Sequence, residues 1–251
     1  SSYRIYLTEL LQSGGFSNDS IQKQPYMIDQ ANPEYYAYHN NTRWQKQIFH
    51  NSYNQNYYLK VTGGDNIASY ALSLGYLKNA GILENTDLTR SETRFNADLN
   101  LSPKLKAAVN LSFVSNQQNL MNQGPASQTN PIYISQTKSP FMAVHDYDEN
   151  GVISPNLADY DVFNVSNPVS LINNMQAQDK NYRFFGSVKF QYLISRSFRL
   201  ETLLGVTFDK VKEDIFIPDA GVVSDTLSKA VATNKSGSRT QRLYTLYNDT
   251  H

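Results

Sequence analysis

The sequence predicts an all-β fold, an antiparallel transmembrane β-barrel segment that contributes about seven strands to a larger barrel and carries short helices in long extracellular loops. Three observations predict it. Apolar and polar residues alternate along each long segment, and successive side chains of a strand point to opposite faces. These segments are about ten residues long, which suits a tilted strand that crosses a bilayer, whereas ordinary strands have about five or six residues. The connections between the segments are alternately tight and long.

The alternating segments form three hairpins and one further strand, which make a partial barrel over residues 54–251. In the first hairpin, Tyr57, Leu59 and Val61 alternate with Tyr58 and Lys60. One face of each strand is therefore apolar, and the other is polar, as expected for a barrel between lipid and a water-filled interior. The two faces of the last strand are mixed and are not assigned. The hairpins are expected at residues 54–77, 90–116 and 182–211, and the last strand from residue 240.

Tight and long connections alternate along the chain. Tight turns are expected at residues 63–66, 102–104 and 195–197, and long loops at 78–89, 117–181 and 212–239. All tight turns then lie at one end of the sheet and all long loops at the other, as in outer-membrane barrels. Aromatic residues near both ends of the apolar bands predict two interfacial girdles. These are Tyr76, Phe113, Phe184 and Phe208 toward the loops, and Tyr70, Tyr192 and Phe198 toward the turns.

Residues 1–53 are expected to form an extracellular loop region with two short helices. Residues 3–11 have apolar side chains at helical spacing, and Gly14 provides a stop. Thr42 and Gln45 match a capping box for a second helix. Trp44 and Phe49 would then pack inward, and Trp44 is interpreted as a core anchor in preference to a ligand platform. The chain between these helices, residues 16–41, is polar and is expected to be a loop.

The loop at residues 117–181 contains a weak candidate for a metal site. Asp146, Asp148 and Asn150 resemble the first half of a calcium loop. Such a loop needs a bidentate Glu at its twelfth position, which is Leu157 here. A hairpin turn with Asn150-Gly151 at its centre explains the run better. A short helix is expected further along, because Asn167 is a capping residue and Pro168 suits the first helical position.

The composition narrows the classes of function. The chain has 22 basic and 22 acidic residues, so its charge does not favour nucleic acid as a partner. It has no cysteine, which excludes disulfides, thiolate metal sites and cysteine nucleophiles. No run of apolar residues is long enough for a membrane-spanning helix, and no signal peptide is recognised, so the chain is expected either to begin inside a longer protein or to be soluble.

The sequence offers little for catalysis. The four histidines are His39, His50, His145 and His251, and none stands at metal-ligand spacing from another. Asp159 and Asp161 are expected to be solvated loop carboxylates. We therefore expect no enzyme activity, no catalytic residue and no cofactor.

Residues 41–64 resemble the SusC/RagA-type TonB-dependent outer-membrane transporters. The residues that carry the resemblance are Asn41-Thr42-Arg43-Trp44-Gln45 through Ile48-Phe49, and the strand that ends in Thr62-Gly63-Gly64. Arg43 stands where that family usually has Asp. The resemblance continues through residues 70–77, 81–86 and 94–100, covers residues 41–116 well, and is looser from Asn167-Pro168 onward.

The resemblance implies a barrel of about 22 strands with an N-terminal plug. It also implies a SusD-like surface lipoprotein as a lid and coupling to the TonB complex through N-terminal parts that are missing here. The chain is then expected to be an interior barrel fragment of an active importer of oligosaccharides or peptides, embedded in the lipid bilayer of a Gram-negative outer membrane. The substrate-binding residues stay unknown. The alternative is a soluble all-β carbohydrate-binding module, with shorter strands and both sheet faces covered.

Overall fold

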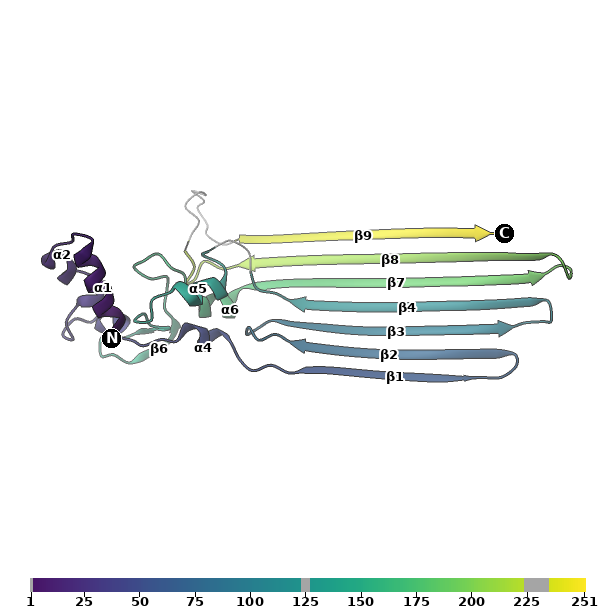
Figure 1. Ribbon diagram of the computed structural model, residues 1–251, viewed down its shortest axis with the longest axis horizontal. Helices are drawn as coiled ribbons and strands as arrows, with labels where there is room; N and C mark the ends of the chain where they lie inside the picture. The colour runs from purple at the N-terminus through teal and green to yellow at the C-terminus, as the bar shows by residue number, and fades with distance from the viewer. Residues whose placement is uncertain (1, 123–126, 224–234) are drawn as a thin grey trace.

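The computed structural model describes residues 2–122, 127–223 and 235–251. Seven strands form one antiparallel sheet in the order β1-β2-β3-β4-β7-β8-β9. The helices lie together at one end of the sheet, and the C-terminus lies at the other end, where the tight turns are (Figure 1). We call the helical end the cap. The strands are β1 Asn54–Gly64, β2 Ala68–Ala80, β3 Asp87–Asn100, β4 Leu105–Asn119, β7 Gln176–Leu193, β8 Arg199–Ile217 and β9 Lys235–Thr250.

The strands have 11 to 19 residues, more than the ten or so that the alternation predicts. They extend toward the cap beyond the apolar band. There the residues on the apolar side of the sheet become polar, so the alternation no longer marks the strands, although the backbone pairing continues. The expected long loop at residues 78–89 is wrong for this reason. β2 and β3 pair as far as Ala80 and Asp87, and a short turn with Asn85 at φ 60° joins them. The last strand likewise begins at Lys235, before the expected residue 240.

One face of the sheet is apolar from strand to strand, because directly paired residues point to the same side. Phe113 pairs with Phe184, Phe184 with Phe208, and Phe208 with Tyr244, which forms an aromatic row across four strands. The register also assigns β9, because Tyr244 and Leu246 lie on the apolar face. These side chains stay uncovered, and Leu246 is 80% exposed. The soluble-module alternative requires a covered face, which the structure does not show.

The apolar face has a definite height. On β8 it runs from Leu200 to Phe208 at alternate residues, which is about 26 Å of strand at roughly 3.3 Å per residue. Outer-membrane barrels carry an outward apolar band about 25 Å tall. Because strands of such barrels are tilted by about 35–45°, this length spans about 20 Å of the band's height, so the face covers most of a lipid-facing band.

Most of the buried apolar core lies in the cap and not on the sheet. One cluster is centred on Ile48, Ile134 and Leu171, and a second contains Tyr26, Trp44, Phe141 and Met142. The cap is built from α1 Ser2–Ser13, α2 Asn18–Gln22, the 3₁₀ helix η1 Pro25–Met27, α3 Tyr35–Tyr38, α4 Trp44–Ile48, α5 Pro131–Thr137, the β5 His145–Tyr147 and β6 Ile153–Leu157 pair, and α6 Pro168–Asn174. Within the described ranges, none of the helices combines the length and the hydropathy that membrane crossing requires.

Some of the helix boundaries predicted in the cap are confirmed and others are wrong. α1 ends just before Gly14, as predicted, and Gly15 follows at φ 83°. The predicted loop at residues 16–41 is wrong, since it contains α2, η1 and α3. The predicted capping box is also wrong. Arg43, and not Thr42, stands at the cap position of α4, and no side chain caps the helix. The Thr42 hydroxyl donates to the Met142 carbonyl at 2.6 Å.

Candidate functional site

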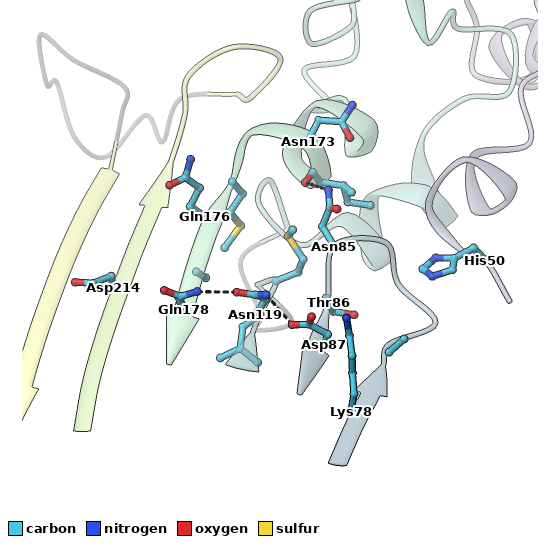
Figure 2. Close-up of a pocket in the computed structure, with 16 residues that line it drawn as sticks. His50, Lys78, Asn85, Thr86, Asp87, Asn119, Asn173, Gln176, Gln178 and Asp214 are labelled. Carbon is cyan, nitrogen blue, oxygen red and sulfur yellow. Dashed lines mark hydrogen bonds between the residues drawn. The ribbon is translucent and has the colours of Figure 1, made fainter. Parts of the chain in front are cut away.

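A polar pocket of about 700 Å³ lies where the strands meet the cap (Figure 2). Residues of β2, β3, β4, β7 and β8 form one side of it, and Ile172, Asn173 and Met175, at the end of α6, form another. His50 enters from the segment after α4. The residues that line it are His50, Lys78, Ala80, Asn85, Thr86, Asp87, Asn119, Leu120, Met121, Ile172, Asn173, Met175, Gln176, Ala177, Gln178 and Asp214.

A row of hydrogen-bonding side chains crosses this pocket from strand to strand. Gln178 Nε2 donates to Asn119 Oδ1 at 3.1 Å, and Asn119 Nδ2 donates to Asp87 Oδ1 at 2.6 Å (Figure 2). Asn119 pairs directly with both neighbours, and Gln178 pairs with Asp214 on β8. The row thus presents amides and carboxylates, groups that bind hydroxyl groups and cations.

The row lies on the same side of the sheet as the apolar band. Asn119 follows Phe113 by six residues on β4, and Asp214 follows Phe208 by six residues on β8, so each pair shares a face. The pocket therefore opens on the outward side of the sheet, and not toward the polar inner face. Asn85 closes its top, since its Nδ2 donates to the Ile172 carbonyl of α6 at 3.0 Å.

A second pocket, of about 400 Å³, lies within the cap. Tyr38, Tyr147 and Tyr160 contribute to its wall beside several carboxylates, and Tyr160 is 48% exposed. Tyr147 donates its hydroxyl to Asn40 Oδ1 at 3.0 Å, which fixes its ring. Aromatic faces next to amide and carboxylate groups suit sugar rings and peptides.

A buried ion pair lies under the cap pocket. Lys138 Nζ is 2.7 Å from Asp161 Oδ2, with side-chain exposures of only 1% and 4%. Lys138 also donates to the Val165 carbonyl at 2.9 Å and lies 5.4 Å from the centre of the Trp44 ring. Burial lowers the pKa of Lys138, and the negative charge of Asp161 partly opposes this.

Two expectations about cap residues are settled by these contacts. Trp44 is a core anchor, as predicted, because it is 3% exposed and its Nε1 donates to the Ser139 carbonyl at 2.9 Å. The expectation that Asp161 is a solvated carboxylate is wrong. The basic partner, Lys138, is 23 residues away in the sequence, so no local pattern reveals the pair.

The weak calcium candidate forms a hairpin turn. Asp148 Oδ1 accepts hydrogen bonds from the amides of Asn150 and Val152 at 2.9 and 2.8 Å, and Gly151 has φ 78°. Asp146 lies on β5, which pairs with β6 across this turn. In the part of the chain that the structure describes, no three His, Cys, Asp or Glu side chains come together at a metal-binding distance. The turn prediction is confirmed.

The chain is similar in sequence to known proteins. No family model matches the chain. The TonB-dependent receptor SusC of Bacteroides thetaiotaomicron is 28% identical over 170 residues, which cover 61% of this chain and 16% of the relative. The resemblance to SusC/RagA-type TonB-dependent transporters is confirmed. A second relative, the TonB-dependent receptor P26 of Formosa agariphila, is 29% identical over 161 residues, which cover 63% of this chain and 15% of that relative.

Solved structures show the same fold. The RagAB peptide importer in its closed-closed state matches with a TM-score of 0.63 at 14% identity, over 96% of this chain and 29% of that one. Another structure of the RagAB peptide transporter matches with a TM-score of 0.59 at 14% identity, over 84% of this chain and 23% of that one. The predicted fold class is confirmed, and this SusC-like chain spans under a third of the length of these relatives.

Proposed function

We propose that this chain forms part of the barrel wall of a TonB-dependent active importer of oligosaccharides or peptides across the outer membrane of a Gram-negative bacterium. The observation that carries the proposal is the continuous outward apolar face, bounded toward the cap by the row from Phe113 to Tyr244. Seven strands with one uncovered apolar face suit lipid on that side. The similarity to SusC and RagAB supports the same function.

Transport of this kind proceeds by binding and conformational gating, without covalent chemistry. The cap contributes the substrate contacts, through the tyrosines and amides around Tyr147 and Tyr160. A SusD-like surface lipoprotein covers the cap as a lid. The TonB complex engages other parts of the full-length protein and supplies the energy. In this proposal the chain is not an enzyme.

Uptake by cells tests the proposal. A strain that lacks the gene is complemented with the full-length protein, and uptake of fluorescent oligosaccharides and peptides is measured with and without an active TonB complex. We expect uptake that requires both. Tyr160→Ala should lower uptake, whereas Tyr133→Ala should not, because Tyr133 is equally exposed at 48% but lies outside the cap pocket. Uptake that persists without TonB would contradict the proposal.

A further inference from the structure

Two pairs of like charges face each other on the outward side of the sheet. Lys180 of β7 pairs directly with Lys212 of β8, and Lys210 of β8 pairs directly with Arg242 of β9. Like charges directly opposite each other destabilise an antiparallel pair. Asp214 offsets part of this charge, since its Oδ2 lies 2.6 Å from Lys212 Nζ. Four cations against one neighbouring carboxylate leave this group positively charged.

The position of the four cations relative to the apolar band is defined by the register. Lys210 follows Phe208 by two residues on β8, and Arg242 precedes Tyr244 by two residues on β9, so the cations begin one row beyond the aromatic row. Phe208 and Tyr244 pack with ring centroids 4.8 Å apart at that row. At the opposite end of the band, the outward positions of β7, β8 and β9 carry no charged residue. The basic group therefore marks the cap side of the band alone.

A groove lies within the apolar band, on the other side of the aromatic row from the cations. Gly186 lacks a side chain at the centre of β7, and a groove of about 600 Å³ opens there. Leu111 pairs with Gly186 from β4 and Val206 pairs with it from β8, so both line the groove on the outward side. Phe184 borders it toward the aromatic row. The aromatic row separates this groove from the cations, and Lys210 lies four residues beyond Val206 on β8, about 13 Å at roughly 3.3 Å per residue. An acyl chain can span that distance across the aromatic row.

We propose that Lys180, Lys210, Lys212 and Arg242 bind the phosphate groups of an anionic lipid in the outer leaflet, with one of its acyl chains crossing the aromatic row into the groove beside Gly186. A phosphate between the opposed cations removes the repulsion within each pair, and an arginine binds phosphate through two parallel hydrogen bonds. The ligand is a lipid and not free phosphate, because the cations begin one row beyond the aromatic row that ends the apolar band. The inference rests on the proposed membrane location of the outward face.

Binding of lipid A, a bisphosphorylated and acylated disaccharide, tests the inference. The full-length protein is purified in a neutral detergent and titrated with lipid A, with dephosphorylated lipid A and with inorganic phosphate. A basic residue near a charged membrane surface contributes about fivefold in affinity. We therefore expect Lys180→Gln with Lys210→Gln to weaken lipid A binding by about 25-fold. Lys60→Gln is the matched control, because Lys60 is an exposed lysine on the inner face of β1.

Two further variants separate binding from stability. Lys210→Glu places opposite charges across from Arg242, so it should raise the melting temperature in detergent while it weakens lipid A binding. Gly186→Leu should fill the groove and weaken binding of lipid A but leave binding of inorganic phosphate unchanged.

Equal lipid A affinity in the double variant and the control would overturn the inference, and so would equal affinity for lipid A and its dephosphorylated form. A nitroxide at position 200, which lies on the outward face of β8 but outside the groove, checks the location after reconstitution. If that probe is accessible from lipid and the double variant binds lipid A as tightly as the control, only this inference fails. If the probe is exposed to water, the proposed membrane location fails as well.

Discussion

The ion pair between Lys138 and Asp161 links two distant parts of the cap. Asp161 Oδ1 also accepts from the amides of Phe163 and Val165 at 2.9 and 3.1 Å, so this carboxylate organises its own loop while it holds Lys138. Both side chains are almost fully buried. Removing one partner would leave the other charged, buried and without compensation.

Lys138→Met should therefore destabilise the cap by about 3–5 kcal/mol. Hydrogen exchange of the Phe163 and Val165 amides measures the loss, because both donate to Asp161 Oδ1. Lys23→Met is the control, since Lys23 pairs with Asp19 at the surface with a side-chain exposure of 74%. That change should alter stability by less than about 1 kcal/mol. Equal exchange in the two variants would contradict a structural role for the buried pair.

His39 makes the N-terminal part of the cap sensitive to pH. Its ring stacks on Tyr35 with centroids 3.6 Å apart, and burial lowers the pKa of His39, while a hydrogen bond to the Tyr35 carbonyl opposes the shift and Arg4 adds to it. The unfolded chain then binds a proton more readily than the folded chain below about pH 6.5. Stability should fall as the pH drops through that range.

Hydrogen exchange of residues 35–40 at pH 7.5 and pH 5, corrected for the intrinsic exchange rate, checks this prediction. His39→Phe keeps an aromatic ring on Tyr35 but cannot titrate, so its protection should change less between the two pH values. The same pH response in the variant would exclude His39 as its cause.

At the scale of elements, α6 depends on one asparagine. Asn167 is fully buried, accepts from the Val169 amide at 3.1 Å, and donates to the carbonyls of Val144 and Ala158 at 3.1 and 2.7 Å. It therefore caps α6 and also fixes the segments around β5 and β6. The side-chain amide nitrogen and oxygen of Asn167 are thus both hydrogen-bonded.

Asn167→Ala should cost more than loss of an ordinary cap, at about 2–4 kcal/mol, because it leaves two buried carbonyls without their donor. Asn167→Asp is the informative comparison. The carboxylate can still cap α6 but cannot donate to Val144 and Ala158. In thermal unfolding of the cap region, the Asn167→Ala and Asn167→Asp variants should both have a melting temperature well below that of the native chain. An aspartate variant as stable as the native chain would show that only the capping of α6 matters.

Local patterns predicted some elements well and others poorly. The α6 cap and the turn at Asn150-Gly151 depend on neighbouring residues, so the sequence reveals them. The capping box at Thr42 failed because α4 starts one residue later, with Arg43 at the cap position, while the Thr42 hydroxyl donates to Met142, 100 residues away. The polar row of Asn119 and Gln178 could not be predicted either. It depends on the register between β4 and β7, and a long cap segment separates these two strands in the sequence.

For the whole molecule, the two faces of the sheet carry opposite chemistry over the full width of seven strands. The alternation within each strand predicted this division, since it requires only the period of two along a strand. The site on the cap required long-range contacts and was not predicted. Paired strands with open edges at β1 and β9 need neighbouring strands to complete a barrel.

The central claim is that the apolar face contacts lipid, and nitroxide accessibility tests it most directly. The chain has no cysteine, so Val206→Cys and Thr207→Cys each give the chain a single labelling site, in the full-length protein with any other cysteine removed. Both residues lie on β8 at adjacent positions and so face opposite sides. In liposomes, we predict that the probe at position 206 is accessible to oxygen and protected from a water-soluble relaxation agent, and that the probe at position 207 shows the reverse. Equal accessibility to the water-soluble agent at both positions would contradict the account.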